Sequence, residues 1–304
     1  MTSQLAEQPI AMLGCDAREV GLAEALLDLG ADLHLVGFPQ DGSLKRALHF
    51  GDPEAAVLGT KAVIAPMSNT DDTGWIRARM DLQETAINLA EVIPLMPCQT
   101  PLLIGVAKPV IRGLATQYRL RLIEMAEINE IAILNSIPTA EGAIYVAMEH
   151  TKMTIHGARI LVLGLGRCGT TLAQSLVALG AHVTVAARSS EDLARAVAQH
   201  CQPLALGSLK SRTDFEILFN TIPAMVLPRS YLRLLDPDTV IIDIAAGPGG
   251  TDFSAAQELG ICAIHALSLP GKVAPKTAAD ILIQTIPHLL AGLLGEEHYD
   301  DYER

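Results

Sequence analysis

The feature that most constrains the fold is the segment 158–169, which reads Ala-Arg-Ile-Leu-Val-Leu-Gly-Leu-Gly-Arg-Cys-Gly. An apolar run of strand length meets a G-x-G-x-x-G pattern, and a helical pattern follows over 170–179. In such a turn the first glycine permits a tight bend and the second lets the backbone approach a pyrophosphate. The third glycine lets the helix pack close to the sheet. The phosphates then lie on N–H groups at the positive end of that helix. The segment therefore predicts a βα unit that binds NAD(P) through Gly164, Gly166, Arg167, Cys168 and Gly169.

Length and composition set the class of protein. A chain of 304 residues, 50% of them hydrophobic and 4% aromatic, suits two domains built from parallel strands covered by helices. The net charge of −12 argues against nucleic acid or an anionic membrane as partner, although a locally basic site could still bind a small anion. The five cysteines are scattered without a C-x-x-C pair, so we expect neither a metal site nor a disulfide framework.

The ends and the apolar runs predict a soluble cytoplasmic protein. The first nine residues lack the charged-then-apolar profile of a signal peptide. No apolar run reaches membrane-spanning length without a charge or a proline.

The N-terminal part has α/β character of its own. A strand over 9–14, a helix from Asp16 to about Leu29 and a strand over 32–38 form a βαβ unit without the G-x-G-x-x-G pattern. Further strands are predicted at 61–66, 102–106 and 131–134. Thr139 then reads as the N-cap of a helix that connects two domains.

The C-terminal part continues the dinucleotide unit. Strands are predicted at 182–187, 215–220, 239–244 and 262–267, and a helix from Ala274 to about Leu294. We therefore expect an α/β protein with two Rossmann-like domains, doubly wound parallel sheets and a cleft between them. Residues 1–139 with 280–304 would form a substrate domain with a returning helix, 140–157 the connecting helix, and 158–279 the NAD(P)-binding domain.

The end of the second dinucleotide strand favours NADP over NAD. An NAD site usually has a carboxylate there to accept from the ribose hydroxyls, whereas this chain has Arg188 and Ser189. A guanidinium with adjacent hydroxyls suits a 2′-phosphate. The alternative is that Arg188 projects into solvent and Ser189 caps a helix, and Ser189 could serve both roles.

Ligands of open α/β sheets lie outside the carboxyl ends of the strands, which selects several further groups. Thr221, Ile222 and Pro223 are expected to lie over the cofactor. Asp243 either contacts the cofactor or holds loop backbone. His265 lies near the end of the last predicted strand and is either a proton acceptor or a packed structural histidine, and Lys272 follows it near a helix start.

Four segments together resemble the family of dipicolinate synthase A subunits. They are Gly-Cys-Asp-Ala-Arg at 14–18, Asn-Ser-Ile-Pro-Thr-Ala-Glu-Gly at 135–142, the glycine loop at 162–169, and Leu-Pro-Gly-Lys-Val-Ala-Pro-Lys-Thr-Ala at 269–278. The second and fourth are more selective than the glycine loop, and the four span nearly the whole chain. One departure is Cys15, where the family pattern has a second glycine.

The resemblance implies NADP-dependent oxidation of dihydrodipicolinate, or of a tetrahydro precursor, to dipicolinate during sporulation. It also implies a flavoprotein-like B subunit as partner and the mother-cell cytoplasm as location. The architecture resembles the formate and glycerate dehydrogenases, and related proteins suggest a homodimer formed through the Rossmann side and the connecting helix.

A dicarboxylate substrate calls for cationic and neutral hydrogen-bond donors, and aromatisation calls for a proton acceptor. The expected substrate-binding residues share positions at strand ends or beside the connecting helix: Arg18, Ser68, Asn69, Ser136, Thr139 and Lys272. His265 is the first candidate for proton transfer and Glu141 the second, although Glu141 could equally be a helix first-turn acid.

Two other functions fit the sequence. One is an NADP-dependent dehydrogenase of a 2-hydroxy or amino acid, although the Arg-Glu-His order expected of the 2-hydroxyacid group is not visible. The other is a non-catalytic NADP-binding subunit of a two-subunit synthase.

Overall fold

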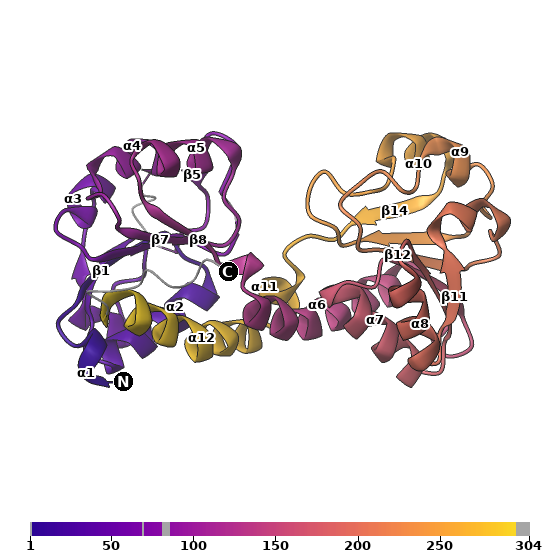
Figure 1. The fold of residues 1–304 in the computed structure, drawn as a ribbon, viewed down its shortest axis with the longest axis horizontal. Coiled ribbons are helices and arrows are strands. Elements are labelled where there is room, and N and C mark those ends of the chain that lie inside the picture. Colours follow the sequence, from indigo (N-terminus) through magenta and orange to yellow (C-terminus); the bar gives the residue numbers. More distant parts are fainter. Residues whose placement is uncertain (1, 69, 81–85, 296–304) are drawn as a thin grey trace. The chain divides into compact units, whose positions relative to one another are not determined.

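The computed structural model describes residues 2–68, 70–80 and 86–295. The chain divides into unit 1, Met1–Ala132 with Pro275–Arg304, and unit 2, Ile133–Ala274 (Figure 1). The first boundary lies inside helix α6 (Asn129–His150), a few residues before the predicted one at 139. The second lies at the start of helix α12 (Pro275–Gly295) rather than at 279.

Unit 1 is built on a parallel sheet with the strand order β3-β2-β1-β4-β7-β8. Its strands are β1 (Pro9–Leu13), β2 (Asp32–Val36), β3 (Leu48–His49), β4 (Ala62–Ile64), β7 (Pro101–Ile104) and β8 (Arg121–Glu124). A small antiparallel pair, β5 (Trp75–Ile76) and β6 (Ile87–Asn88), lies outside this sheet. The chain leaves β1 toward β2 and later returns on the other side of β1 as β4. The carboxyl ends of β1 and β4 therefore form a switch point, where ligands of such sheets bind.

Helices cover both faces of this sheet (Figure 1). Helix α2 (Ala17–Asp28) and α12 pack against each other, and Gly21 permits this because a Cβ there would lie 3.2 Å from the Cβ of Ala279. The other described helices of unit 1 are α1 (Thr2–Leu5), α3 (Pro53–Val57), α4 (Leu89–Val92) and α5 (Pro109–Gln117). Helices α3, α4 and α5 contribute to one apolar core with β1, β4 and β7.

Unit 2 repeats the topology in the order β11-β10-β9-β12-β13-β14. Its strands are β9 (Arg159–Leu163), β10 (His182–Ala187), β11 (Gln202–Ala205), β12 (Ile217–Asn220), β13 (Val240–Asp243) and β14 (Cys262–His265). Its helices after α6 are α7 (Arg167–Ala178), α8 (Ser190–Ala198), α9 (Arg229–Leu232), α10 (Phe253–Leu259) and α11 (Leu269–Val273). This order is that of dinucleotide-binding domains, with its switch point between β9 and β12. The predicted α/β fold class is confirmed in both units.

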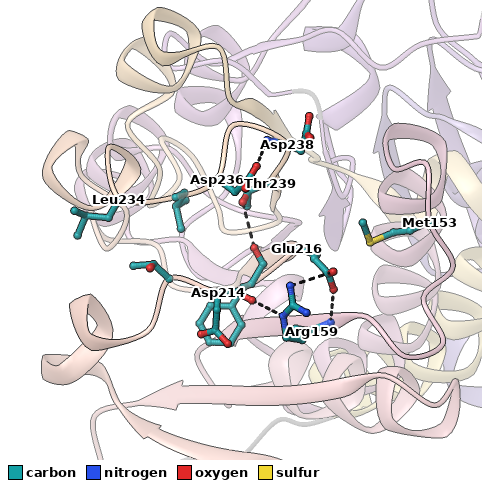
Figure 2. Close-up of a pocket in the computed structure, with 11 residues that line it drawn as sticks. Met153, Arg159, Asp214, Glu216, Leu234, Asp236, Asp238 and Thr239 are labelled. Carbon is teal, nitrogen blue, oxygen red and sulfur yellow. Dashed lines mark hydrogen bonds and ion pairs between the residues drawn. The ribbon is translucent and has the colours of Figure 1, made fainter.

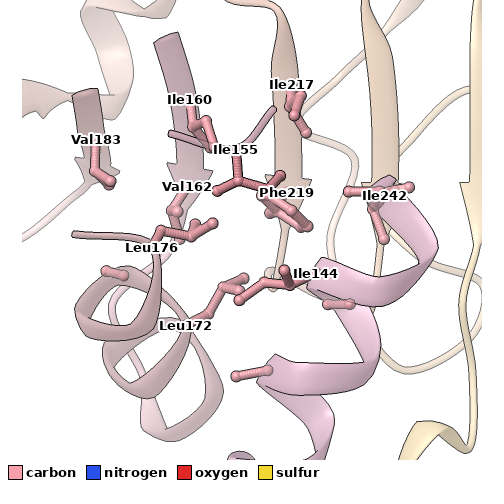
Figure 3. Close-up of a cluster of buried hydrophobic side chains, with 14 of the residues drawn as sticks. Ile144, Ile155, Ile160, Val162, Leu172, Leu176, Val183, Ile217, Phe219 and Ile242 are labelled. Carbon is pink, nitrogen blue, oxygen red and sulfur yellow. The ribbon is translucent and has the colours of Figure 1, made fainter. Parts of the chain in front are cut away.

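The core of unit 2 explains why its strands read as continuous apolar runs (Figure 3). Val162 and Phe219 point to the face covered by α6 and α7, where they meet Ile144 and Leu172. The alternate residues on these strands point to the opposite face, into a second core shared with α9 and α10. Because both faces are buried, the usual alternation of apolar and polar residues disappears.

Helix α6 corrects two predictions. Residues 131–134 are helical rather than a strand, and Thr139 is not an N-cap, because the helix begins at Asn129. The short apolar run forms the start of a helix that runs on to His150, and periodicity alone could not distinguish it from a strand. Proline inside the helix at Pro138 does not end it.

Helices α6 and α12 are the two described helices long and apolar enough to cross a membrane by length and composition alone. Each has a buried face inside a unit, on the sheet of unit 2 for α6 and on α2 for α12. These buried faces account for much of the apolar content of both helices.

Candidate functional site

The glycine loop of unit 2 has the geometry that its pattern predicts. Gly164 has φ +92°, and a Cβ there would lie 2.5 Å from the Thr221 hydroxyl oxygen. A Cβ on Gly169 would lie 2.2 Å from the Gly164 carbonyl oxygen, which is closer than any tolerated contact. By contrast, a Cβ on Gly166 would meet nothing within 4 Å. The fold therefore requires glycine at Gly164 and Gly169, whereas Gly166 leaves the surface above the start of α7 open.

The start of α7 suits an anion. Gly166 is its N-cap and, having no side chain, makes no side-chain cap hydrogen bond to the first turn. Arg167 and Cys168 occupy the first two helical positions, and burial raises the pKa of the Cys168 thiol, so this group stays neutral. Unsatisfied N–H groups and the helix dipole together favour a phosphate here. These residues fit the pyrophosphate of a dinucleotide.

The segment after β12 forms the other side of this switch point. The Thr221 hydroxyl donates to the Leu163 carbonyl oxygen over 2.8 Å, which ties the segment to the strand before the glycine loop. Asn220 is fully buried and shapes the turn by accepting from Ile222 N–H and donating to the Ile222 carbonyl. Sequence reasoning missed Asn220, although an asparagine ending an apolar strand is a usable signal. Pro223 is exposed at the end of the turn.

Arg188 and Ser189 lie at the carboxyl end of β10, both exposed. The Ser189 hydroxyl accepts from Asp192 N–H at 3.0 Å and donates to the Asp192 carboxylate at 2.7 Å, so it caps α8. Arg188 forms no ion pair with the part of the chain that the structure describes, whereas Arg195 on the helix that follows pairs with Glu191. Arg188 is thus the guanidinium at this strand end that remains available to a ligand.

Asp243 holds loop backbone. Its carboxylate is fully buried and accepts from the N–H groups of Ala245 and Gly250 and from the Thr251 hydroxyl, at 2.7–3.0 Å. The structure shows Asp243 bracing the loop, and its contact with the cofactor stays a prediction. The half-buried His265 lies beside it on β14, with Nε2 3.0 Å from the Ala245 carbonyl oxygen.

His265 is held from two sides. Its ring stacks on Phe253 with 5.2 Å between ring centroids. When Nε2 carries the proton and donates to Ala245, Nδ1 keeps a lone pair that can accept another. The arrangement fixes the ring at the carboxyl edge of unit 2, the edge that also carries the glycine loop.

At the switch point of unit 1, the structure brings Arg18 and Ser68 together. Arg18 is 5% exposed, and its guanidinium donates to the Asp16 carboxylate through Nε and Nη2 and to Ser68 Oγ over 2.7 Å. Asp16 caps α2 by accepting from Arg18 N–H. Asn69 lies outside the described residues.

Glu19 completes this cluster and was missed from the sequence. Its carboxylate is 1% exposed and accepts from the N–H groups of Asp16 and Met67. Burial, followed by the charge of Asp16, raises the pKa of Glu19 to about 7. The pattern Asp-Ala-Arg-Glu at 16–19 predicts a capping box, but it does not predict the hydrogen bond from Met67 N–H to Glu19.

Comparison with known proteins now identifies the family. The chain is 39% identical to the A subunit of dipicolinate synthase from Bacillus subtilis (strain 168), over 95% of this chain and 97% of the relative. The chain belongs to the family of dipicolinate synthase A subunits. Residues 9–126 match the family model for the N-terminal domain of the dipicolinate synthase A subunit.

Structures of the family agree with this assignment. The A-subunit structure from Bacillus halodurans has a TM-score of 0.88 at 35% identity and covers 96% of this chain and 99% of its own. That from Bacillus subtilis has a TM-score of 0.87 at 38% identity with the same two coverages. Residues 159–247 also match the model described as NADP oxidoreductase coenzyme F420-dependent, so unit 2 of this family member is of the nicotinamide-dinucleotide-binding type.

Four further residues predicted for substrate binding or chemistry lie on α6 and α11 of unit 2. Ser136 is fully buried in α6, where its hydroxyl contacts Thr171 Oγ1 at 2.6 Å. Thr139 donates to the Asn135 carbonyl within the same helix. Glu141 is exposed in the middle of α6, not in its first turn, because the helix begins twelve residues earlier, at Asn129. Lys272 is exposed on α11.

A pocket of about 500 Å³ lies elsewhere in unit 2 (Figure 2). It opens at the amino ends of β9, β12 and β13, where Arg159 pairs with Glu216 at 3.2 Å. The carboxylates of Asp214, Asp236 and Asp238 also line it. A dicarboxylate would be repelled there, and the glycine loop lies at the opposite edge of the sheet, so this pocket is not the candidate site.

Proposed function

We propose that this chain oxidises dihydrodipicolinate, or a tetrahydro precursor, to dipicolinate with NADP as the oxidant. The observation that carries the proposal is a dinucleotide-binding loop of fitting geometry in a member of the family of dipicolinate synthase A subunits. The reaction belongs to dipicolinic acid synthesis in sporulation. We place it, by the family resemblance, in the mother-cell cytoplasm.

The cofactor would be held by unit 2. The N–H groups at the start of α7 would bind the pyrophosphate, and the bare Gly166 backbone would let it approach. Arg188 would bind the 2′-phosphate as a charge-assisted partner, with Ser189 beside it. Thr221 would contact the cofactor from the end of β12, on the other side of β9. NADP supplies the hydride acceptor when bound.

The substrate would be held by unit 1. Arg18 is a cation at a switch point, preset by Asp16, and Ser68 adds a hydroxyl beside it. A carboxylate of the substrate would bind the guanidinium edge that Asp16 and Ser68 leave free. Aromatisation of the ring favours the reaction, so the residues mainly position the substrate.

His265 is the proposed proton acceptor. Substrate loses a hydride to the oxidant and a proton to a base, and Nδ1 of His265 can accept that proton while Nε2 stays bonded to Ala245. Glu141 is a weaker candidate because it stands exposed in the middle of α6 and no described group orients its carboxylate.

The test uses the purified full chain, NADP and enzymatically generated dihydrodipicolinate, with NADPH and dipicolinate both measured. We expect the two products in equal amounts, at rates above the uncatalysed oxidation. His265→Ala should bind NADP normally and turn over slowly. Turnover that requires a B subunit would instead favour a non-catalytic NADP-binding subunit, and turnover of 2-hydroxy or amino acids alone would favour the other dehydrogenase.

We also propose that two copies of the chain associate through α6. The exposed positions of α12 are polar at helical spacing, at Lys276, Asp280, Gln284 and His288. The exposed face of α6 carries four apolar side chains at helical spacing, Ile133, Ile137, Tyr145 and Met148, each 48–59% exposed, with Glu141 between them. Two helices of similar length and apolar content thus differ in their exposed faces, and an apolar stripe of this kind is typical of an interface.

The test of the homodimer is the molar mass in solution by light scattering. Ile137→Glu should shift a dimer toward monomer while leaving the fold intact, and Gln284→Glu on α12 is the matched control. An unchanged mass for Ile137→Glu would contradict this interface. A flavoprotein-like B subunit is a separate proposed partner. The family resemblance supports it, since the Bacillus subtilis relative is itself one subunit of a synthase.

A further inference from the structure

We propose that Glu19 is the positioning residue of the unit 1 site, fixing the helix start that carries Arg18 to the loop that carries Ser68. The proposal rests on the function proposed above, in which Arg18 and Ser68 bind the substrate.

Glu19 joins two segments that are far apart in the sequence. Its Oε2 accepts from Asp16 N–H at 2.9 Å, at the start of α2. Its Oε1 accepts from Met67 N–H at 3.0 Å, in the loop that follows β4. Each carboxylate oxygen therefore holds one segment, and both bonds are made in a place almost closed to water.

These two bonds complete a closed ring of contacts. Asp16 accepts from Arg18, Arg18 Nη2 donates to Ser68 Oγ at 2.7 Å, and Ser68 follows Met67, which donates back to Glu19. Glu19 is the most buried member of the ring. Without its carboxylate, only the Arg18–Ser68 bond would hold the helix start and the loop together within the ring.

A plain capping role does not account for the second bond. In a capping box the glutamate needs only the N-cap N–H, which is the bond to Asp16. The bond to Met67 adds nothing to the helix and aligns the neighbouring loop residue instead. A positioning role therefore makes a claim about substrate binding that a capping role does not.

The charges around Glu19 make its protonation relevant near neutral pH. The charged groups that face it are Asp16 and Arg18, from its own helix start, while α12 presents apolar Ala279 and Ile283 to Gly21 of the same helix. A protonated carboxyl has one oxygen committed as a donor, so it holds two N–H groups less well than a carboxylate does. Positioning should be complete above about pH 7 and weaken below it.

The experiment compares Glu19→Gln with the matched control Glu24→Gln, an exposed glutamate on the same helix. Glutamine keeps one acceptor oxygen and replaces the other with a donor. We expect Glu19→Gln to raise KM for dihydrodipicolinate about tenfold or more with a smaller change in kcat, the size of one charge-assisted hydrogen bond. Wild-type KM should rise as the pH falls through about 7, whereas KM of Glu19→Gln stays high and flat. The Kd for NADP should not change.

A second readout does not depend on the reaction. Hydrogen exchange at the Met67 amide should be faster in Glu19→Gln than in wild type and unchanged in Glu24→Gln. If wild type fails to oxidise dihydrodipicolinate, the proposed function fails, and this exchange still reports on Glu19. If Glu19→Gln does not fold, Glu19→Asp, which shortens the same carboxylate, takes its place. An unchanged KM, an unchanged pH profile of KM or unchanged Met67 exchange would each overturn the proposal.

Discussion

Gly166 and Gly169 differ in what a side chain would meet, and this separates binding from folding. We expect Gly166→Ala to fold with wild-type stability, because its Cβ meets no protein atom within 4 Å, yet to bind NADP about tenfold or more weakly. Gly169→Ala should lose both, because its Cβ would lie 2.2 Å from a backbone oxygen, at a cost of about 1–3 kcal/mol. Denaturant unfolding and NADP titration check the pair. Equal losses of stability in both variants would contradict this assignment of roles.

Arg188 is the residue that we propose selects NADP over NAD. Arg188→Ala should weaken NADPH binding by about 1.5–3 kcal/mol, the range for a hydrogen bond to a charged group, and leave NADH binding unchanged. Arg195→Ala is the control, because Arg195 already pairs with Glu191 at 2.6 Å. Fluorescence titration with both dinucleotides gives the comparison. Equal effects of Arg188→Ala on NADPH and NADH would show that Arg188 does not contact the 2′-phosphate.

Glu19 should affect the pH dependence of stability as well as substrate binding. Its pKa is raised from 4.5 in the unfolded chain to about 7 in the folded protein, so the folded state retains a proton that the unfolded state has lost between these values. The free energy of unfolding of wild type, relative to Glu19→Gln, should therefore fall as the pH rises from about 4.5 to about 7 and level off above that.

The size of this fall is on the order of 3 kcal/mol. Urea denaturation of both proteins across that pH range measures it. A difference between the two proteins that stays constant with pH, or that grows with rising pH, would show that Glu19 does not have a raised pKa.

At the scale of the element, α6 shows where sequence patterns mislead. The run Ile-Ala-Ile-Leu at 131–134 is short and apolar, which fits a buried strand as well as a helix, and Pro138 stands between it and the helical pattern beyond. In the structure one helix, Asn129–His150, spans both segments. Edge strand β8 was missed for the opposite reason, since its sequence Arg-Leu-Ile-Glu has only two apolar residues.

The position of Ser136 in the same helix gives a further prediction. Its hydroxyl is buried between α6 and α7 and contacts Thr171 Oγ1, which also bonds the Arg167 carbonyl, so Ser136→Ala removes one neutral hydrogen bond and should cost about 0.5–1.5 kcal/mol in stability. KM for dihydrodipicolinate should stay at the wild-type value. Thermal unfolding and steady-state kinetics test both expectations. A raised KM with unchanged stability would return Ser136 to the substrate site.

At the scale of the whole molecule, local patterns predicted the two sheets and the cofactor loop but only part of the rest. The roles of Gly164, Gly166 and Gly169 could be predicted because a dinucleotide-binding turn needs glycine at three fixed positions of the sequence. The Glu19–Met67 bond could not be predicted, because it depends on how β1 and β4 become neighbours in the sheet. Asp243 was left between two roles for the same reason, and its three partners come from the folded loop.

The most direct test of the account is the stoichiometry of the reaction by the purified chain alone. Wild type, NADP and dihydrodipicolinate should give one NADPH for each dipicolinate, and Gly166→Ala should give a much lower rate at the same NADP concentration. Dipicolinate formed at the uncatalysed rate by well-folded wild type saturated with NADP, with no NADPH produced, would contradict the central claim.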